Sequence, residues 1–287
     1  MNIVELRKPS LVHDGTQILS HSSVAFELAA EVERLLIEKG IVSQKVELSE
    51  LHEYVSLKNL QVDEHFMNPV NTSFYETSDL FRKLYFDLIS YIAKEIFEFD
   101  FIFQETPNVR FLFPTGHEKR SEKLVGLPGQ HSDTMLGHSF EEINCWLPIT
   151  DCYGSNSLLL SDLETGIQVL SKVMDDLDWD LDRYFLEGRD YYRRKVSVDE
   201  GISLLIDKHT KPLKLKVGDF VAFDTRCLHG SPLNKEGSTR VSIDFRIIPL
   251  HRYKLLTRSY RSNGRTRRRF MRGDVFYETS ARDLGAI

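Results

Sequence analysis

The sequence predicts a mainly β fold with flanking α-helices, in which a β-sandwich or jelly roll carries additional helices at its N-terminal side. Before about residue 100, apolar residues recur at helical spacing in two long segments. Beyond that point, short β-prone runs follow one another, and turn-forming residues separate most of them. No repeat or low-complexity linker interrupts the 287 residues, which favours a single domain.

Two amphipathic helices are expected before the β-rich part. The first covers residues 24–40, with Ser22 and Ser23 as candidate N-caps and Gly40 as its stop signal. The second covers residues 79–99 and carries its apolar residues on one face. These apolar residues are Leu80, Leu84, Phe86, Leu88, Ile89, Ile92 and Ile96.

The β-rich part is expected to contain strands at residues 99–103, 109–114, 141–149, 156–161, 201–206, 213–217, 219–223 and 240–248. An acidic and aromatic insertion at residues 162–195 is expected to be partly helical. The single domain is therefore organised as a helical part over residues 1–104, a jelly-roll core over 105–250 and a basic C-terminal arm over 251–287.

The composition is that of a soluble globular protein, with 41% hydrophobic and 28% charged residues. The cysteines are odd in number and never spaced as CxxC, which disfavours a disulfide framework and fits a reducing cytoplasm. No apolar run approaches the ~18 residues of a membrane span, and the N-terminus lacks the apolar region of a signal peptide. We therefore expect a cytoplasmic protein without a membrane partner. No feature indicates an oligomeric state.

The net charge of -6 is distributed unevenly along the chain. Residues 251–272 contain nine Arg and Lys residues and no acidic residue. Such a segment can contact phosphates, nucleic acid or an acidic face of its own protein. The overall acidity argues against a dedicated nucleic-acid binder and favours a solvated or internally paired arm.

The first motif with metal-binding potential is GQHSDT, residues 129–134. If this segment is extended, His131 and Asp133 point to the same side, because side chains alternate along a strand. An imidazole and a carboxylate on one side can take adjacent positions on one metal ion. The HxD pattern alone is common and has little specificity.

The second motif follows a predicted buried strand. Gly218 and Asp219 form a turn, residues 220–223 form the strand, and His229 lies at the start of the next segment. By itself His229 is better explained as an ordinary core or surface histidine. Its value as a candidate ligand depends on the HxD motif.

The third motif lies in the strand at residues 240–248, whose two faces differ in polarity. Arg240, Ser242, Asp244 and Arg246 share one face, and the residues between them are apolar. Four polar residues on one face require water, mutual pairing or a polar ligand. The Arg240 guanidinium beside the Ser242 hydroxyl suits a carboxylate ligand. Arg246, on the same face, is the alternative residue for binding the carboxylate of a ligand.

Together the motifs offer two histidines and a carboxylate, the facial triad that binds non-haem iron(II) and leaves coordination positions open. Zinc is the rival metal, but a zinc site does not require a downstream arginine for a carboxylate. The combination of HxD, a distal histidine and RxS eleven residues beyond it resembles the 2-oxoglutarate/Fe(II)-dependent oxygenase superfamily. The resemblance covers roughly residues 105–250.

The resemblance implies a double-stranded β-helix, or jelly roll, with His131, Asp133 and His229 as ligands of Fe(II). It further implies that Arg240, assisted by Ser242, binds the distal carboxylate of 2-oxoglutarate, with O₂ as the other co-substrate. Residues 154–161 resemble a stretch of phytanoyl-CoA-hydroxylase-like members, although the histidine-containing loop that often follows there is missing. Residues 144–158 also look similar to dioxygenases from aminoglycoside and sugar-antibiotic biosynthetic clusters.

Three further residues are candidates for the cavity of such an oxygenase. Asn144 is expected to face inward and to hydrogen-bond 2-oxoglutarate, the alternative being a buried amide bonded to the backbone. Trp146 shares its face and is a candidate wall of the substrate pocket or an ordinary core residue. Arg110 either reaches the same cavity or forms a surface ion pair. His117 and His138 flank the HxD motif and are better explained as solvated loop histidines.

The expected function is hydroxylation of a small molecule of secondary or sugar metabolism by an Fe(II)/2-oxoglutarate-dependent dioxygenase. Desaturation, epoxidation and ring closure are compatible with the same ligands. One alternative is an oxygenase that acts on a protein or RNA through the basic arm. Others are a non-catalytic metal-binding jelly-roll protein and a zinc hydrolase.

Overall fold

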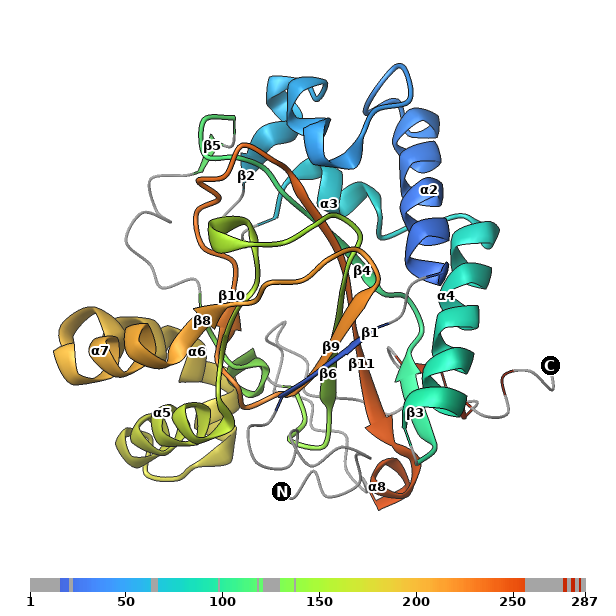
Figure 1. The fold of residues 1–287 in the computed structure, drawn as a ribbon. Helices are drawn as coiled ribbons and strands as arrows, with labels where there is room; N and C mark the ends of the chain where they lie inside the picture. The colour runs from blue at the N-terminus through green and yellow to red at the C-terminus, as the bar shows by residue number, and fades with distance from the viewer. Residues whose placement is uncertain are drawn as a thin grey trace.

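Two antiparallel sheets form the jelly roll at the centre of the molecule (Figure 1). The computed structural model describes residues 16–20, 23–62, 67–97, 99–117, 119–120, 130–136, 138–255, 276–277, 280–281 and 284. The larger sheet has the order β1 (Thr16–Ser20), β9 (Asp219–Asp224), β6 (Ile143–Pro148), β11 (Arg240–Pro249), β3 (Phe101–Gln104) and β12 (Phe276–Tyr277), with β4 (Asn108–Leu112) also paired to β11. The smaller sheet has the order β10 (His229–Gly230), β7 (Leu159–Ser161) and β8 (Thr210–Pro212).

The two sheets pack against each other through an apolar cluster. Trp146 and Phe223 of the larger sheet share this cluster with Leu160 of the smaller sheet. A short parallel pair, β2 (Gln61–Val62) with β5 (Lys119–Arg120), lies apart from both sheets. The cysteines Cys145, Cys152 and Cys227 are all buried free thiols.

Strand β11 shows the alternation that the sequence predicts. Its apolar residues, Val241, Ile243, Phe245 and Ile247, are at most 1% exposed and belong to the main hydrophobic core. Three of its polar residues, Arg240, Asp244 and Arg246, line a cavity on the other side of the sheet. The strand therefore separates the core from the cavity, and its register places every polar side chain on the cavity side.

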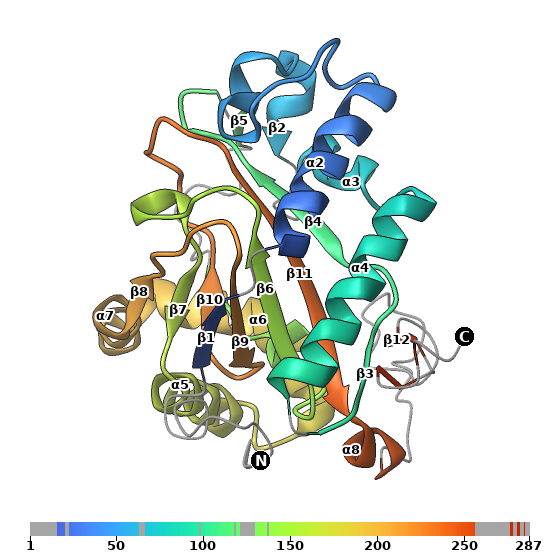
Figure 2. The same cartoon turned by 45° about the vertical axis from the view of Figure 1, so that its right-hand side comes forward.

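The N-terminal helices cover the core face of the larger sheet (Figures 1 and 2). Helix α2 (Ser23–Glu38) packs against α4 (Asp79–Tyr91), and a π-helical segment (Ile92–Ile96) continues α4. Both expected helices are confirmed, although Leu80 is 48% exposed and does not belong to the apolar face. Between them lie η1 (Leu48–Glu53), η2 (Leu57–Leu60) and α3 (Pro69–Ser73).

The insertion is helical, as expected, and forms α5 (Leu163–Asp176) and α6 (Leu181–Val198). The expected strand at residues 201–206 was wrong, because α7 (Glu200–His209) covers it. Asp199 caps this helix by accepting from the Ile202 N–H group, and the buried Ile202 and Ile206 lie one helical turn apart. Residues 213–217 form only an isolated bridge, between Leu215 and Cys152.

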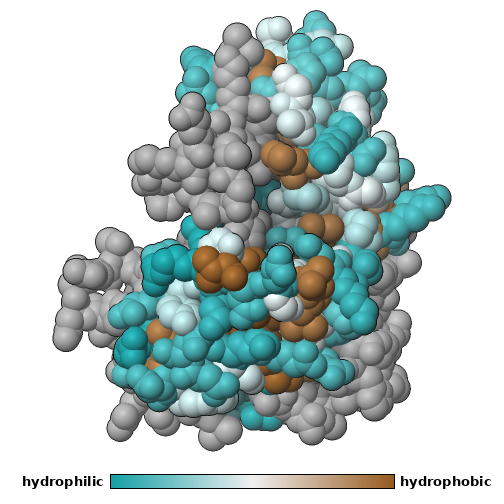
Figure 3. All heavy atoms as spheres, turned by 90° about the vertical axis from the view of Figure 1, so that its left-hand side faces the viewer, coloured by the Kyte–Doolittle hydropathy of each residue, from teal (hydrophilic) through white to brown (hydrophobic). Residues whose placement is uncertain are grey.

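The surface on the side of α5, α6 and α7 is mainly hydrophilic (Figure 3). The acidic residues of the insertion largely point to solvent or form pairs such as Asp176 with Lys195. No helix within the described ranges has the length and apolar character needed to cross a membrane. Of the C-terminal arm predicted at residues 251–287, the structure describes most of α8 (Leu250–Leu255), β12 and residues 280–281 and 284. Residues 256–275, which hold most of the basic side chains, lie outside the described ranges.

Replacing Gly166 with Ala is expected to destabilise the fold by about 1–3 kcal/mol. Gly166 lies in α5, and a Cβ atom there would come within 2.2 Å of the Arg226 carbonyl oxygen. The segment that begins at Arg226 continues to His229, so the strain would also displace this histidine. Urea denaturation measures the loss, and Gly237→Ala, where nothing lies within 4 Å of the added atom, is the matched control.

Candidate metal centre and cavity

The structure brings His131, Asp133 and His229 together, as the sequence motifs predict. Oδ1 of Asp133 lies 3.6 Å from Nε2 of His131 and 3.4 Å from Nε2 of His229. The two imidazole rings have centroids 4.8 Å apart, and the ligand atoms of all three residues lie within 4.8 Å of one another. One ion can therefore contact all three side chains.

Backbone pairing fixes the two histidines relative to each other. His131 donates its N–H to the His229 carbonyl at 2.9 Å, and His229 donates back to His131 at 2.8 Å. Nδ1 of His229 lies 3.1 Å from the Cys227 carbonyl oxygen, so Nδ1 is the donor and Nε2 presents its lone pair towards Asp133. This tautomer is the one that binds a metal through Nε2.

A backbone hydrogen bond and a chain of hydroxyl groups hold the HxD loop in place. The Asp133 N–H group donates to the Thr225 carbonyl at 3.1 Å, and Asp133 begins the short helix η5 (Asp133–Leu136). The hydroxyl groups of Ser132, Thr134 and Tyr184 form a chain with distances of 2.9 and 2.8 Å. Tyr184 lies on α6, so this helix buttresses the loop. Burial raises the pKa of Tyr184 to about 12, which keeps its hydroxyl neutral.

Arg246 neutralises the buried Asp133. Its Nε and Nη2 atoms donate to Oδ2 of Asp133 at 2.9 and 2.7 Å, which leaves Oδ1 towards the histidines. Burial alone would raise the pKa of Asp133, but Arg246, the strongest of the opposing influences, holds this pKa well below its usual range. The carboxylate is therefore ionised and ready to bind a cation. The expectation that Arg246 is the rival carboxylate anchor is not supported by this geometry, because its guanidinium pairs with Asp133.

A cavity of about 300 Å³ opens beside the three candidate ligands. Arg240 lines it, donates from Nη1 to Ser231 Oγ at 2.9 Å and lies over the Trp146 ring at 5.6 Å from the ring centroid. Trp146 and Asn144 line the same cavity, as the alternation of β6 predicts. Arg240 as a whole is only 4% exposed, so its guanidinium presents a buried positive charge to a ligand in the cavity.

Two buried polar atoms point to a missing ligand. Nδ2 of Asn144 and Oγ of Ser242 have no hydrogen-bond partner among the residues that the structure describes. Leaving a buried polar atom without a partner is costly in folded proteins, and a bound ion, water or ligand relieves this cost. Asn144 lines the cavity, and Ser242 shares the polar face of β11 with Arg240. The donor set therefore fits an oxygen-rich, anionic ligand between them and the metal centre.

Arg110 lies at the cavity and also takes part in an ion pair. It lines the cavity and also forms an ion pair with Asp244, with 3.0 Å between Nε and Oδ2. Asn108 donates to the other oxygen of Asp244 at 2.7 Å. Residues from two other segments also line the cavity, which are Val62, Met67, Asn68, Asn71 and Arg193. They lie in residues 41–75 and in the insertion at residues 162–195, the segments expected to line the pocket, but no motif marks them individually or marks the buttress Tyr184.

Known proteins resemble this chain in sequence and in fold. No protein-family model matches the chain. The streptomycin biosynthesis protein StrG of Streptomyces griseus is 24% identical over 188 residues. The match covers 65% of this chain, and the chain spans 65% of the length of that relative.

Solved structures of other proteins are similar to this chain. The non-heme alpha ketoglutarate dependent carbocyclase SnoK from nogalamycin biosynthesis superposes with a TM-score of 0.51 at 13% identity, over 93% of this chain and 92% of SnoK. EctD from S. alaskensis with 2-oxoglutarate and 5-hydroxyectoine has a TM-score of 0.48 at 12% identity, over 84% of this chain and 74% of EctD. The likeness to SnoK confirms the expected jelly-roll fold. StrG and SnoK together confirm the expected similarity to proteins of antibiotic biosynthesis.

Proposed function

We propose that the protein is a non-haem Fe(II)- and 2-oxoglutarate-dependent dioxygenase that hydroxylates a small molecule of secondary or sugar metabolism. The observation that carries this proposal is the cluster of His131, Asp133 and His229 beside a cavity with a buried arginine. Two imidazoles and one carboxylate suit Fe(II) and leave three coordination positions for other ligands. With 2-oxoglutarate and O₂, bound iron supplies the oxidising chemistry.

The chain's own residues bind and orient the reactants. Arg240 binds the distal carboxylate of 2-oxoglutarate, because its guanidinium is buried in the cavity and can donate two parallel hydrogen bonds. Asn144 and Ser242 supply the buried donors that lack a partner among the described residues. The Trp146 ring packs against one side of the Arg240 guanidinium and excludes water from that side.

The size of the cavity favours a small molecule over a folded macromolecule. A volume of about 300 Å³ holds a co-substrate and part of a small substrate. Polar groups on its wall, among them Arg110, Asp244 and Arg193, suit a substrate rich in hydroxyl or amino groups. StrG is named as a streptomycin biosynthesis protein and SnoK comes from nogalamycin biosynthesis, which supports a small molecule of secondary metabolism as the substrate.

Replacing Arg240 with Gln is expected to raise the 2-oxoglutarate concentration needed for half-maximal turnover by roughly 10- to 100-fold. Loss of a charged, bidentate hydrogen bond costs about 1.5–3 kcal/mol, which corresponds to this range. The maximal rate at saturating 2-oxoglutarate should fall less, since the proposed role of Arg240 is to bind the co-substrate and not the metal. Arg252→Gln is the control, because Arg252 pairs with Glu141 and is not among the cavity residues of the described chain.

The test of the function measures succinate formed from 2-oxoglutarate with Fe(II) and O₂, against a panel of sugars, amino sugars and other small metabolites. The proposal predicts slow substrate-independent turnover and a marked stimulation by one class of the panel. Iron bound at stoichiometry without any 2-oxoglutarate consumption would favour a non-catalytic binding protein. Hydrolysis of an ester or amide by the zinc-loaded protein would favour the zinc hydrolase.

A further inference from the structure

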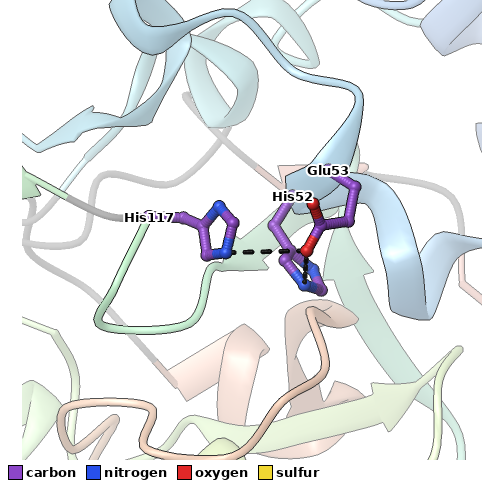
Figure 4. A group of neighbouring side chains, drawn as sticks. All are labelled: His52, Glu53 and His117. Carbon is purple, nitrogen blue, oxygen red and sulfur yellow. Dashed lines mark ion pairs between the residues drawn. The ribbon is translucent and has the colours of Figure 1, made fainter.

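A second group of potential metal ligands lies outside the candidate iron site (Figure 4). His52 and Glu53 end the short helix η1, and His117 ends the turn that follows β4. Oε1 of Glu53 lies 3.3 Å from Nε2 of His52 and 3.6 Å from Nε2 of His117. In Figure 4 both rings point towards this carboxylate oxygen.

A hydrogen bond to Thr239 fixes the orientation of the His52 ring. Its Nδ1 atom lies 2.8 Å from Oγ1 of Thr239, a residue with no exposed surface. The same oxygen accepts the His52 backbone N–H at 3.2 Å, and the Thr239 N–H donates to the Ser49 carbonyl at 2.7 Å. When Nδ1 donates to Thr239, Nε2 carries the lone pair that faces Glu53. A histidine held in this way by a buried oxygen is typical of metal-binding histidines.

The three candidate ligands differ in exposure. His52 is buried, at 7% exposed. The side chains of His117 and Glu53 are more exposed, at 36% and 59%, so an ion can reach the cluster from solvent. The cluster therefore combines one fixed, buried ligand with two adjustable ligands at the surface.

The distances match the requirements of zinc. Zn–N and Zn–O bonds of about 2.0–2.2 Å place two ligands of a tetrahedron roughly 3.3–3.6 Å apart. The two measured ligand distances, 3.3 and 3.6 Å, lie in this range, and all three ligand atoms lie within 4.8 Å of one another. Two imidazoles favour zinc over calcium or magnesium, which prefer oxygen ligands.

We propose that His52, Glu53 and His117 form a second metal site that binds zinc(II), with water as the fourth ligand. The ion would join η1 to the turn at residues 115–117. It would also stabilise the contact of η1 with Thr239, the residue immediately before Arg240. The site is thus a clamp at the end of β11 where the proposed 2-oxoglutarate anchor lies.

Zinc stoichiometry tests this proposal. The metal-free chain is titrated with zinc(II) against a fluorescent chelator. Because the two histidines and the aspartate of the candidate iron site are also ligands that suit zinc, the wild type should bind two equivalents. His117→Ala and His229→Ala should each bind one, and the variant with both substitutions should bind none. His209→Ala is the matched control and should keep two equivalents, since His209 has only Asp162 as a described ion-pair partner.

Two further readouts make the outcome decisive. Zinc should raise the Tm of His229→Ala and leave that of the double variant unchanged, because only the former retains the clamp. Glu53→Gln, a near-isosteric change of an exposed side chain, should lower the affinity of one equivalent at least tenfold even if His117→Ala folds poorly. A wild type that binds a single equivalent, removed by His229→Ala, would overturn the proposal, as would two equivalents in both His117→Ala and Glu53→Gln.

Discussion

Arg246→Met should destabilise the metal-free protein by about 3–5 kcal/mol, the usual cost of leaving a buried charge without its partner. Arg246 donates twice to Asp133 and lies 3.6 Å from Glu142, and both carboxylates are at most 1% exposed. Without the guanidinium, the two acids face each other in a poorly solvated interior. Urea denaturation of the metal-free variant and wild type at neutral pH measures the difference.

The pH dependence of stability provides a second readout of the same substitution. In the wild type, the lowered pKa of Asp133 means that its carboxylate contributes stability above about pH 4, the ordinary unfolded value. This contribution disappears as the pH falls through the folded-state pKa. In Arg246→Met the contribution is lost, so stability should depend less steeply on pH in the acid range. Arg252→Met is the control. A loss of less than about 1 kcal/mol in the unfolding free energy of Arg246→Met at neutral pH would contradict the account.

His229→Ala should weaken Fe(II) binding by on the order of 100-fold or more, since loss of a direct ligand exceeds the effect of losing a supporting residue. Succinate formation should fall to background at the same time. His229 also hydrogen-bonds the Cys227 carbonyl through Nδ1 and contacts the Phe223 ring, so the substitution removes these contacts together with the ligand. Fe(II) titration under anaerobic conditions checks the affinity. His209→Ala serves as the control, and unchanged iron affinity in His229→Ala would exclude His229 as a ligand.

The strands that carry the site could be predicted from the sequence because their two faces differ clearly in polarity. In β11 and β6, polar residues alternate with residues of the main core, and this alternation placed Arg240, Asn144 and Trp146 on the cavity side. The HxD and distal histidine motifs were recognisable because their residue types and spacing are rare in combination. The spacing of the residues could not predict that Arg246 pairs with Asp133, which only the folded structure shows.

Other parts of the structure left no readable pattern in the sequence. The run at residues 201–206 is short and mostly apolar, so its pattern did not distinguish a strand from α7. In the structure Asp199 caps this segment as a helix. Tyr184 reaches Thr134 only because α6 folds back on the HxD loop. His52 and His117 lie 65 residues apart and meet only in the folded chain, so neither gave a signal as part of a metal site. Long-range contacts of this kind have no local signature.

Anaerobic titration of the metal-free protein with Fe(II) and then 2-oxoglutarate tests the central claim most directly. Chelation of iron by the keto acid group of 2-oxoglutarate produces a visible charge-transfer band, which zinc at the second site cannot produce. The account predicts this band in the wild type, its loss in His229→Ala, and a shift to much higher 2-oxoglutarate concentrations in Arg240→Gln. Stoichiometric iron binding without a band at any 2-oxoglutarate concentration would contradict the assignment of His131, Asp133, His229 and Arg240 to an oxygenase site.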